Sequence, residues 1–415
     1  MDEQERLDRA RIRAYYFGDK PNADKAMRIA GVGHLSDPVE VDPYAGLSDP
    51  VDILITMMGR MPYRSAAHEV PYPLSRADLF KRLTPGAQTR MKQHAMRQLE
   101  QGDDAVAIEI LVSLVCLCGA SLADCLPALM QKDVYFPGIL YRNAGSAVAR
   151  CLVDDIELSG GYQGAKLAAL AWTGTEEAVS AFRRWRAEAS ENEVWRVIEL
   201  KTASHAAGWE ITSEGERRDL FDMACFGLNE GMDAAKENDV VKLLAESDAV
   251  CPWCSGKLMT LLDLIPGSEK LGSLALETNR LRVATCMHCG CYEDLYMDIS
   301  STGDYCWYPG NRKPDDLPPR GDGDGAVAPA TRFLSDRRRD AYEAADWTLG
   351  ISVSQIGGFP SWVQDARYPA CPTCRGTMKF VAQVDLGEFD RLAQGMFYTF
   401  SCGSCCRTAT VYQQS

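Results

Sequence analysis

The sequence has few of the residues, and none of the short motifs, on which hydrolytic or nucleotide-dependent catalysis usually depends. It contains only five histidines in 415 residues, and none stands in a recognisable acid–base setting. It has no His-Glu-x-x-His, Gly-x-Ser-x-Gly, Walker loop or dinucleotide-binding glycine pattern. Acidic pairs such as Asp154-Asp155 and Glu176-Glu177 are typical of solvated helix ends. These absences favour a protein that is not an enzyme.

Long hydrophobic runs are also missing. The most apolar stretch, residues 108–129, is interrupted by Asp124 and Pro127, so it predicts a buried helix pair and not a membrane span. The first twenty residues are charged throughout and do not read as a secretory signal. We therefore expect a cytoplasmic protein with no membrane partner, whose 16 cysteines are thiols or metal ligands and not disulfides.

Positive charge is in short supply. The chain has 44 basic and 58 acidic side chains, for a net charge of -14, and residues 101–250 alone hold 25 acidic against 13 basic residues. Such a surface repels phosphates, so we expect no nucleic-acid partner. By the same Coulombic argument it attracts a basic protein partner.

Residues 101–248 are predicted to form an acidic helical domain. Residues 164–172 have apolar side chains at helical spacing, and Thr173-Gly174-Thr175 reads as a helix end followed by an N-cap. The next apolar helix face consists of Ala178, Val179, Phe182 and Trp185. The pair resembles one HEAT-type repeat, and residues 105–130 and 217–246 are candidates for flanking helices. An irregular helical domain is the alternative.

Four cysteine pairs, each with two intervening residues, occupy the C-terminal half. They are Cys251 and Cys254, Cys286 and Cys289, Cys371 and Cys374, and Cys402 and Cys405. Each pair can turn both sulfurs towards one ion, and two pairs complete a tetrahedral set with Zn–S distances of about 2.3 Å. Four thiolates leave no open position, so we expect two structural zinc ions. The intervals of 31 and 27 residues between the pairs exceed the usual ~15–20 of a zinc ribbon.

Some ligand assignments stay open in the sequence. Cys291 competes with Cys289, and Cys406 with Cys405, whereas His288 between two cysteines reads as a bystander. An iron–sulfur cluster would use the same four thiolates and is an alternative to zinc. The remaining cysteines stand mostly in apolar helical contexts, where we expect small buried hydrophobes, and Cys306 is undecided. That group is Cys116, Cys118, Cys125, Cys151 and Cys225.

The two cysteine blocks read as one unit used twice. Each begins Cys-Pro-x-Cys-x-Gly, continues into a strand, and places its second pair between two further strand candidates. We therefore predict an internal duplication, in which residues 251–299 superpose on residues 371–414. Gly256 and Gly376 are expected to adopt the left-handed backbone that ends the first turn.

The fold class expected is α+β, with a helical N-terminal half, HEAT-like packing being one option, followed by two β-rich zinc-knuckle units. The expected divisions are an irregular N-terminal region (1–100), the acidic helical domain (101–248), a first zinc unit (249–308), a Pro/Gly/Asp-rich linker or loop (309–340) and a second zinc unit (341–415).

A longer pattern surrounds the second cysteine block. It consists of Ser354–Gln364 (SQIGGFPSWVQ), the Cys371 knuckle, Met378–Val384 with its glutamine, and Phe397–Cys402. This order resembles the zinc-binding half of the programmed-cell-death protein 2 family and is similar to bacterial YwqG-like proteins, over about the last 65 residues. The resemblance implies a β-rich, zinc-stabilised scaffold that handles proteins. In the eukaryotic relatives the role is chaperoning a ribosomal protein.

Within that pattern, Gly357-Gly358 permits a tight turn that Cβ atoms would block. Trp362 is expected to pack against the zinc unit and not to contact a ligand. Together these features predict a non-enzymatic protein-interaction protein, most concretely a bacterial immunity-type protein that sequesters a basic toxin. A chaperone for a basic client, or an enzyme with an unrecognised site in residues 1–250, are the alternatives.

Overall fold

The computed structural model describes most of the chain beyond residue 38. The described residues are 39–59, 67–159, 164–189, 194–230, 240–265, 280–321, 328–345, 353–390 and 393–414. The chain divides into two compact units, Met1–Leu114 and Val115–Ser415. Among the described helices, none combines the length and the hydrophobicity that a membrane span requires.

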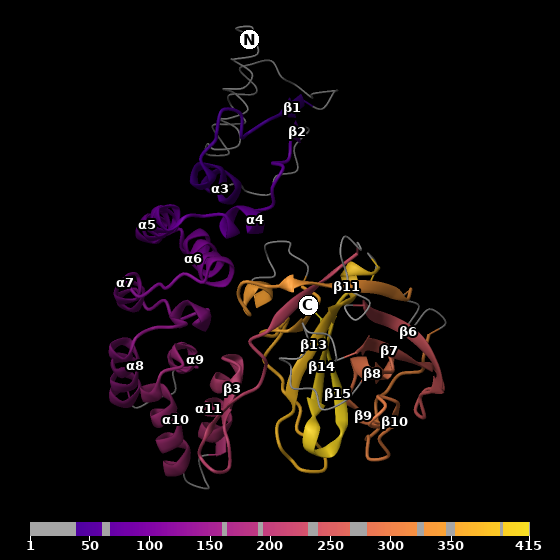
Figure 1. Cartoon of the computed structure of the whole chain (residues 1–415). Helices are drawn as coiled ribbons and strands as arrows, with labels where there is room; N and C mark the ends of the chain where they lie inside the picture. The colour runs from indigo at the N-terminus through magenta and orange to yellow at the C-terminus, as the bar shows by residue number, and fades with distance from the viewer. Residues whose placement is uncertain are drawn as a thin grey trace. The chain divides into compact units, whose positions relative to one another are not determined.

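The described part of the first unit is mainly helical (Figure 1). Its elements are β1 (Val39–Val41), α3 (Pro50–Met58), β2 (Ala67–Glu69), α4 (Arg76–Lys81), α5 (Pro85–Gln101) and α6 (Asp104–Cys118). Strands β1 and β2 pair in parallel. Helix α5 begins where the Thr84 side chain accepts a hydrogen bond from the backbone N–H of Ala87, and proline occupies the first helical position. Leu54, Phe80 and Met91 are buried in its core.

The second unit begins with a helical segment. Its helices are α7 (Leu126–Gln131), α8 (Ser146–Leu158), α9 (Gly164–Thr173), α10 (Glu176–Glu188) and α11 (Val194–Ala206), with a 3-10 turn at Gly138–Tyr141. The predicted helix boundary at residues 173–175 is confirmed. Gly174 has a φ of +62°, and the Thr175 hydroxyl accepts a hydrogen bond from the backbone N–H of Ala178. The apolar face expected for α10, including Phe182 and Trp185, is buried.

The helical prediction for residues 217–246 was wrong for the described part of that range. After α11 the chain forms β3 (Trp209–Ile211) and β4 (Arg217–Asp219), then β5 (Cys225–Asn229) and β6 (Val240–Val250). Strands β5 and β6 each pair with strands far along the chain. Pairing at such distance overrides the helix-forming composition of the segment, because strand formation depends on neighbours more than on intrinsic preference.

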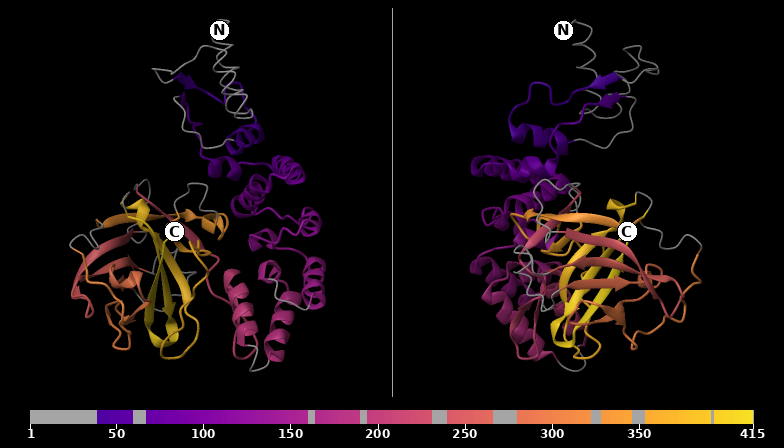
Figure 2. Two further views of the ribbon diagram at one scale, coloured as in Figure 1. Left: turned by 180° about the vertical axis from the view of Figure 1, so that it is seen from behind. Right: turned by 45° about the vertical axis from the view of Figure 1, so that its right-hand side comes forward.

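Among the described residues after β4, the strands form one antiparallel sheet of 11 strands. Its order is β10-β9-β15-β14-β13-β12-β5-β11-β6-β7-β8. The further bounds are β7 (Lys257–Leu264), β8 (Leu281–Thr285), β9 (Leu295–Ile299), β10 (Tyr305–Trp307), β11 (Ala330–Arg337), β12 (Gln355–Gly357), β13 (Lys379–Asp385), β14 (Met396–Cys402) and β15 (Arg407–Gln413). In both views of Figure 2 the yellow C-terminal strands lie beside the orange and rose strands that precede them in the chain. The protein thus combines helices with a large antiparallel sheet.

Strand β11 corrects the reading of residues 309–340 as a linker or loop throughout. It lies in the interior of the sheet, between β5 and β6, and is antiparallel to both. The edge strand β8 also lies close to β15. The buried hydroxyls of Thr285 on β8 and Thr410 on β15 are hydrogen-bonded at 2.8 Å. The two halves of the sheet therefore share one structure and are not separated by a linker.

The Gly-Gly turn fastens the helices to the sheet. Gly357 and Gly358 have φ values of +66° and +73°, as the tight-turn prediction requires. The turn presents Phe359 to Trp172 of α9, with ring centroids 5.0 Å apart. The same ring stacks on Tyr342, also at 5.0 Å, and Tyr342 lies under the guanidinium of Arg142. Aromatic burial of this kind contributes more than its area alone.

Candidate metal centres

The first four-cysteine set comes from two turns at one end of neighbouring strands. Cys251 and Cys254 precede β7, and Cys286 and Cys289 follow β8. Their four Sγ atoms all lie within 4.8 Å of one another. The Cys251 and Cys289 sulfurs are 3.7 Å apart, and those of Cys254 and Cys286 are 3.5 Å apart. A regular tetrahedron with Zn–S distances of 2.3 Å has edges of about 3.8 Å, so the set fits one zinc-sized ion.

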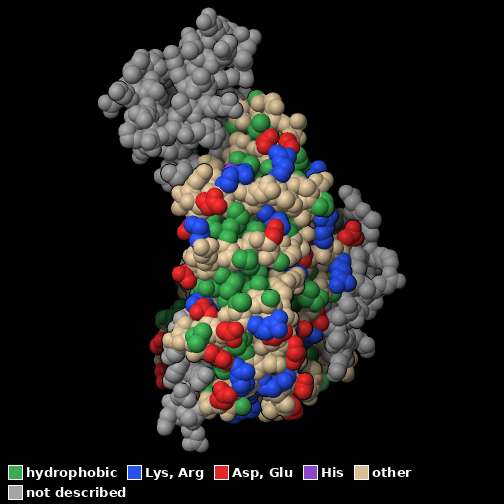
Figure 3. Space-filling view, turned by 90° about the vertical axis from the view of Figure 1, so that its left-hand side faces the viewer, with side chains coloured by type: hydrophobic (Ala, Val, Ile, Leu, Met, Phe, Trp, Pro, Cys, Tyr) green, Lys and Arg blue, Asp and Glu red, His purple; other side chains and the backbone are tan. Residues whose placement is uncertain are grey.

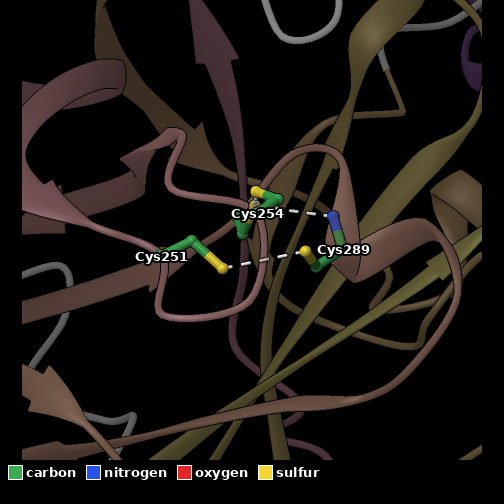
Figure 4. Close-up of side chains that lie close together, drawn as sticks. Cys251, Cys254 and Cys289 are labelled. Atoms are coloured by element: carbon green, nitrogen blue, oxygen red, sulfur yellow. Dashed lines mark hydrogen bonds between the residues drawn. The ribbon is translucent and has the colours of Figure 1, made fainter. Parts of the chain in front are cut away.

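Figure 4 shows the Cys251 and Cys289 sulfurs pointing towards each other. The separations are far longer than the ~2.05 Å of a disulfide bond. The four side chains are therefore arranged around a common point as thiols.

The second set repeats this arrangement at the other knuckle pair. Cys371 and Cys374 precede β13, Cys402 ends β14, and Cys405 lies in the turn that leads to β15. These four sulfurs also lie within 4.8 Å of one another, with 3.7 Å between Cys374 and Cys402. The structure thus gathers all eight predicted ligands into two groups that could each hold a metal ion.

The residues left open by the sequence fall outside both sets. Cys291 is exposed, and its thiol donates to the Met287 carbonyl at 3.1 Å. Cys406 is exposed as well. The Nε2 atom of His288 lies 3.0 Å from the Pro318 carbonyl oxygen, away from the sulfurs. Cys289 and Cys405 are therefore the group members.

Both leading knuckles have the same backbone, but the glycine prediction was wrong. The N–H of Cys251 donates to the Gly256 carbonyl at 2.7 Å, and the N–H of Cys371 donates to the Gly376 carbonyl at 2.8 Å. The left-handed residues are Ser255 and Arg375, each directly after the second cysteine, with φ of 59° and 63°. At Gly256, space is the reason for glycine: a Cβ there would lie 2.5 Å from the Arg320 side chain.

The duplication holds for two strands of each unit and fails for the third. Both β7–β8 and β13–β14 are antiparallel and irregular at one point, Leu261 in one and Val381 in the other, each seven residues after the second cysteine. In the second zinc unit β14 then pairs with β15. In the first zinc unit, β9 pairs with β15 and β10 instead of with β8.

Turn length explains the difference. Residues 403–406 alone join β14 to β15, which is short enough for a hairpin, whereas residues 286–294 separate β8 from β9. The longer turn allows β9 to pair with β15 of the second zinc unit. The full superposition of 251–299 on 371–414 is therefore not expected beyond the second strand.

The sulfurs of the first set shift one another's pKa through shared hydrogen bonds. Contacts with Cys286 and Cys289 lower the pKa of the Cys251 thiol. The same contact with Cys251 raises the pKa of the Cys286 thiol. A divalent cation among the four sulfurs would favour the deprotonated form of each.

A buried arginine, which no sequence motif indicates, joins the two zinc units. Arg407, directly after Cys406, is only 6% exposed. Its guanidinium donates to the Thr373 hydroxyl inside the second leading knuckle at 2.7 Å and to Asp298 of β9 at 2.5 and 2.8 Å. It also lies 3.7 Å from the centre of the Tyr308 ring. No local pattern marks this residue, since its partners lie more than 30 positions away.

The other cysteines follow the buried-hydrophobe prediction only in part. Cys116, Cys125 and Cys225 are buried, and burial raises the pKa of Cys225 to about 11. Cys118 is half-buried, and Cys151 of α8 is exposed, contrary to expectation. Cys306 is also exposed. Trp362 packs on Tyr398 of β14 with ring centroids 4.6 Å apart, and so lies against the second zinc unit as predicted.

Comparisons with known proteins give one informative match. No family model matches the chain, so none supports the resemblance to the programmed-cell-death protein 2 family or to YwqG-like proteins. No solved structure matches it either. The chain is 30% identical over 379 residues to a Salmonella typhimurium protein described as "Uncharacterized protein YpfL", covering 90% of this chain and 88% of the other. The chain therefore belongs to the same protein family as Salmonella YpfL.

Proposed function

We propose that the chain is a non-enzymatic, zinc-stabilised protein-interaction protein in which each four-cysteine set holds one structural zinc ion. The closed donor set carries this proposal: four sulfurs lie within 4.8 Å in each group. Four thiolates saturate tetrahedral zinc and leave no position for a water or a substrate. Sulfur separations of 3.5 to 3.7 Å suit a single ion, whereas a multi-iron cluster stands between its thiolates and holds them farther apart.

The proposed partner is a basic protein. The chain has a net charge of -14, and the acidic excess is concentrated in residues 101–250. On α8 and α10, however, acidic and basic side chains are interspersed (Figure 3), and Arg184 pairs with Glu157. The exposed acids there include Asp154, Glu176 and Glu188. Glu191 and Glu193 belong to the same acidic stretch of the sequence and lie outside the described residues.

The helical segment is the proposed docking surface. Helix α8 packs on α9 and α10, and α11 packs on α9, which is compatible with stacked HEAT-type pairs. A stacked array presents a broad, rigid surface, and opposite charge raises the rate of association. In its most concrete form, the protein is an immunity-type protein that sequesters a basic toxin in the cytoplasm.

A second candidate, a chaperone for a basic client such as a ribosomal protein, is favoured by the SQIGGFPSWVQ segment and its resemblance. Both candidates require a basic partner, and the partner's identity separates them. A toxin encoded beside this chain supports the first, and a ribosomal protein supports the second.

The test begins with the partner. Cross-linking in cells followed by mass spectrometry should identify a protein of net positive charge bound to the wild-type chain. Asp154→Lys, Glu176→Lys and Glu188→Lys in one variant should lower its affinity about tenfold, mainly through slower association, because exposed charges contribute individually ~0.2–1 kcal/mol. Surface plasmon resonance over a salt series measures this directly.

A matched control changes the same net charge elsewhere. Asp248, Asp315 and Asp316 are exposed on the sheet side of the chain, and their triple replacement by lysine should leave association nearly unchanged. Equal weakening by both triple variants would place the effect in net charge and not in α8 and α10. An acidic partner would contradict the proposal altogether.

A further inference from the structure

The two four-cysteine sets differ sharply in their access to solvent. In the first, Cys251, Cys286 and Cys289 are at most 2% exposed, and Cys254 is half-buried. In the second, Cys371 is buried, whereas Cys402 and Cys405 are half-buried and Cys374 is exposed. The same four-thiol ligand set is thus shielded from solvent at the first site and partly exposed to it at the second.

Among the described residues, a group of apolar side chains packs over the first set. Trp253, Tyr305, Trp307 and Leu317 pack against the buried cluster that contains Cys251, Cys286 and Cys289. The rings of Trp253 and Trp307 meet edge to face at 5.1 Å. The His288 contact with the Pro318 carbonyl holds residues around 318 over this end. In the second set, residues 403–406 turn directly into β15. Cys402 and Cys405 are partly buried against the cluster that contains Cys371, and Cys374 is exposed.

A fifth thiol stands beside the open set. Cys406 is exposed and directly follows Cys405, in the left-handed conformation with a φ of 49°. Within the set, the Sγ atoms of Cys374 and Cys402 lie 3.7 Å apart. An oxidant that reaches Cys374 therefore finds a second thiolate within a short movement.

We infer that the second centre is a redox-responsive zinc site and the first a permanent one, an inference that rests on the proposed zinc occupancy. The oxidant is a peroxide. The Cys374 thiolate attacks one peroxide oxygen, so that an S–O bond forms, the O–O bond breaks, and hydroxide leaves. The Cys402 thiolate then attacks that sulfur, forming an S–S bond and releasing a second hydroxide.

Over these two reaction steps the sulfurs of Cys374 and Cys402 each lose one electron, and the two peroxide oxygens are reduced. Cys371 and Cys405 remain as two ligands of four, which are too few to hold the ion, and zinc leaves. A disulfide reductant and zinc reverse the change. Loss of zinc frees the Cys371 knuckle, in which the Thr373 hydroxyl accepts a hydrogen bond from Arg407. The link that Arg407 makes between the two zinc units is thereby loosened.

The experiment treats the purified, zinc-loaded full chain with hydrogen peroxide in the presence of a chromogenic zinc chelator. One zinc per chain should be released about tenfold or more faster than the other, because oxidation follows exposure of the thiolate. Mass spectrometry after thiol blocking should find a disulfide between Cys374 and Cys402, with Cys251, Cys286 and Cys289 still reduced.

Cys406→Ser is the matched variant. It removes the exposed thiol that is outside the set, and the fast release and the Cys374–Cys402 disulfide should both persist. A disulfide between Cys405 and Cys406, or loss of fast release in this variant, overturns the inference. Release of both zinc ions at one rate also overturns it, while leaving the proposed function intact. A chain that contains no zinc before oxidation contradicts the proposed function itself, and this inference with it.

Discussion

Cys251→Ser should reduce the bound zinc from two ions per chain to one. It should also lower the melting temperature of the compact unit Val115–Ser415, which contains both cysteine sets, by roughly 10 °C or more. The Cys251 sulfur is fully buried, and 3.7 Å from that of Cys289. A serine hydroxyl is a poor zinc ligand, so the turn before β7 loses its connection to the turn after β8. Structural zinc contributes about 10–16 kcal/mol of apparent binding energy in small domains, and we expect the variant to lose several kcal/mol of it.

Cys291→Ser is the control for that result. Cys291 lies two positions from a group member, but it is exposed and outside the set. This variant should retain two zinc ions and melt within about 2 °C of wild type, as surface substitutions do. Calorimetry with parallel metal analysis distinguishes the two. Identical melting and zinc content for the two variants would contradict the assignment of Cys251.

Gly358→Ala should destabilise the second unit by roughly 3 kcal/mol without changing its zinc content. Gly358 has a φ of +73°, and a Cβ at this position would lie 2.5 Å from the Cys225 sulfur and 2.9 Å from the Ala341 carbonyl oxygen. Its N–H also donates to the carbonyls of Asp222 and Ala224, so the turn cannot shift without breaking those bonds. Backbone strain and overpacking therefore add together.

The matched control is Gly145→Ala in the same unit. Gly145 precedes α8 with an ordinary φ of -72°, and a Cβ there meets nothing within 4 Å. Its stability should change by less than about 1 kcal/mol. Chemical denaturation of both variants measures the contrast. A Gly358→Ala variant as stable as Gly145→Ala would show that the turn adapts, and that it does not fix Phe359 against Trp172.

Features set by a few consecutive residues could be predicted from the sequence. The cysteine pairs turn within four residues, and both leading knuckles have the same backbone hydrogen bond from the first cysteine. The boundary between α9 and α10 depends on Gly174 and Thr175 alone. Glycine likewise indicates the positive φ of Gly357 and Gly358. In each case the residue types indicate the local backbone, although the carbonyls of Asp222 and Ala224 also hold Gly358 in place.

Features that depend on distant pairing were missed or misread. Strand β9 pairs with β15, more than 100 residues away, and nothing in Leu295–Ile299 indicates which partner it takes. Residues 217–246 were predicted as a candidate helix, yet Val240–Val250 form a strand that pairs with β7 and β11. Arg407 became interpretable only when the fold placed Asp298 and Thr373 beside it. Exposure of the second centre likewise depends on which distant residues pack over it, which is a property of tertiary structure.

X-ray absorption at the zinc edge, together with metal analysis of the purified chain, tests directly whether each closed four-sulfur set holds a structural zinc ion. We expect about two zinc ions per chain, no visible chromophore, and four sulfur neighbours per zinc at about 2.3 Å. Less than one zinc per chain, iron with inorganic sulfide, or zinc bound mainly by nitrogen and oxygen would contradict it.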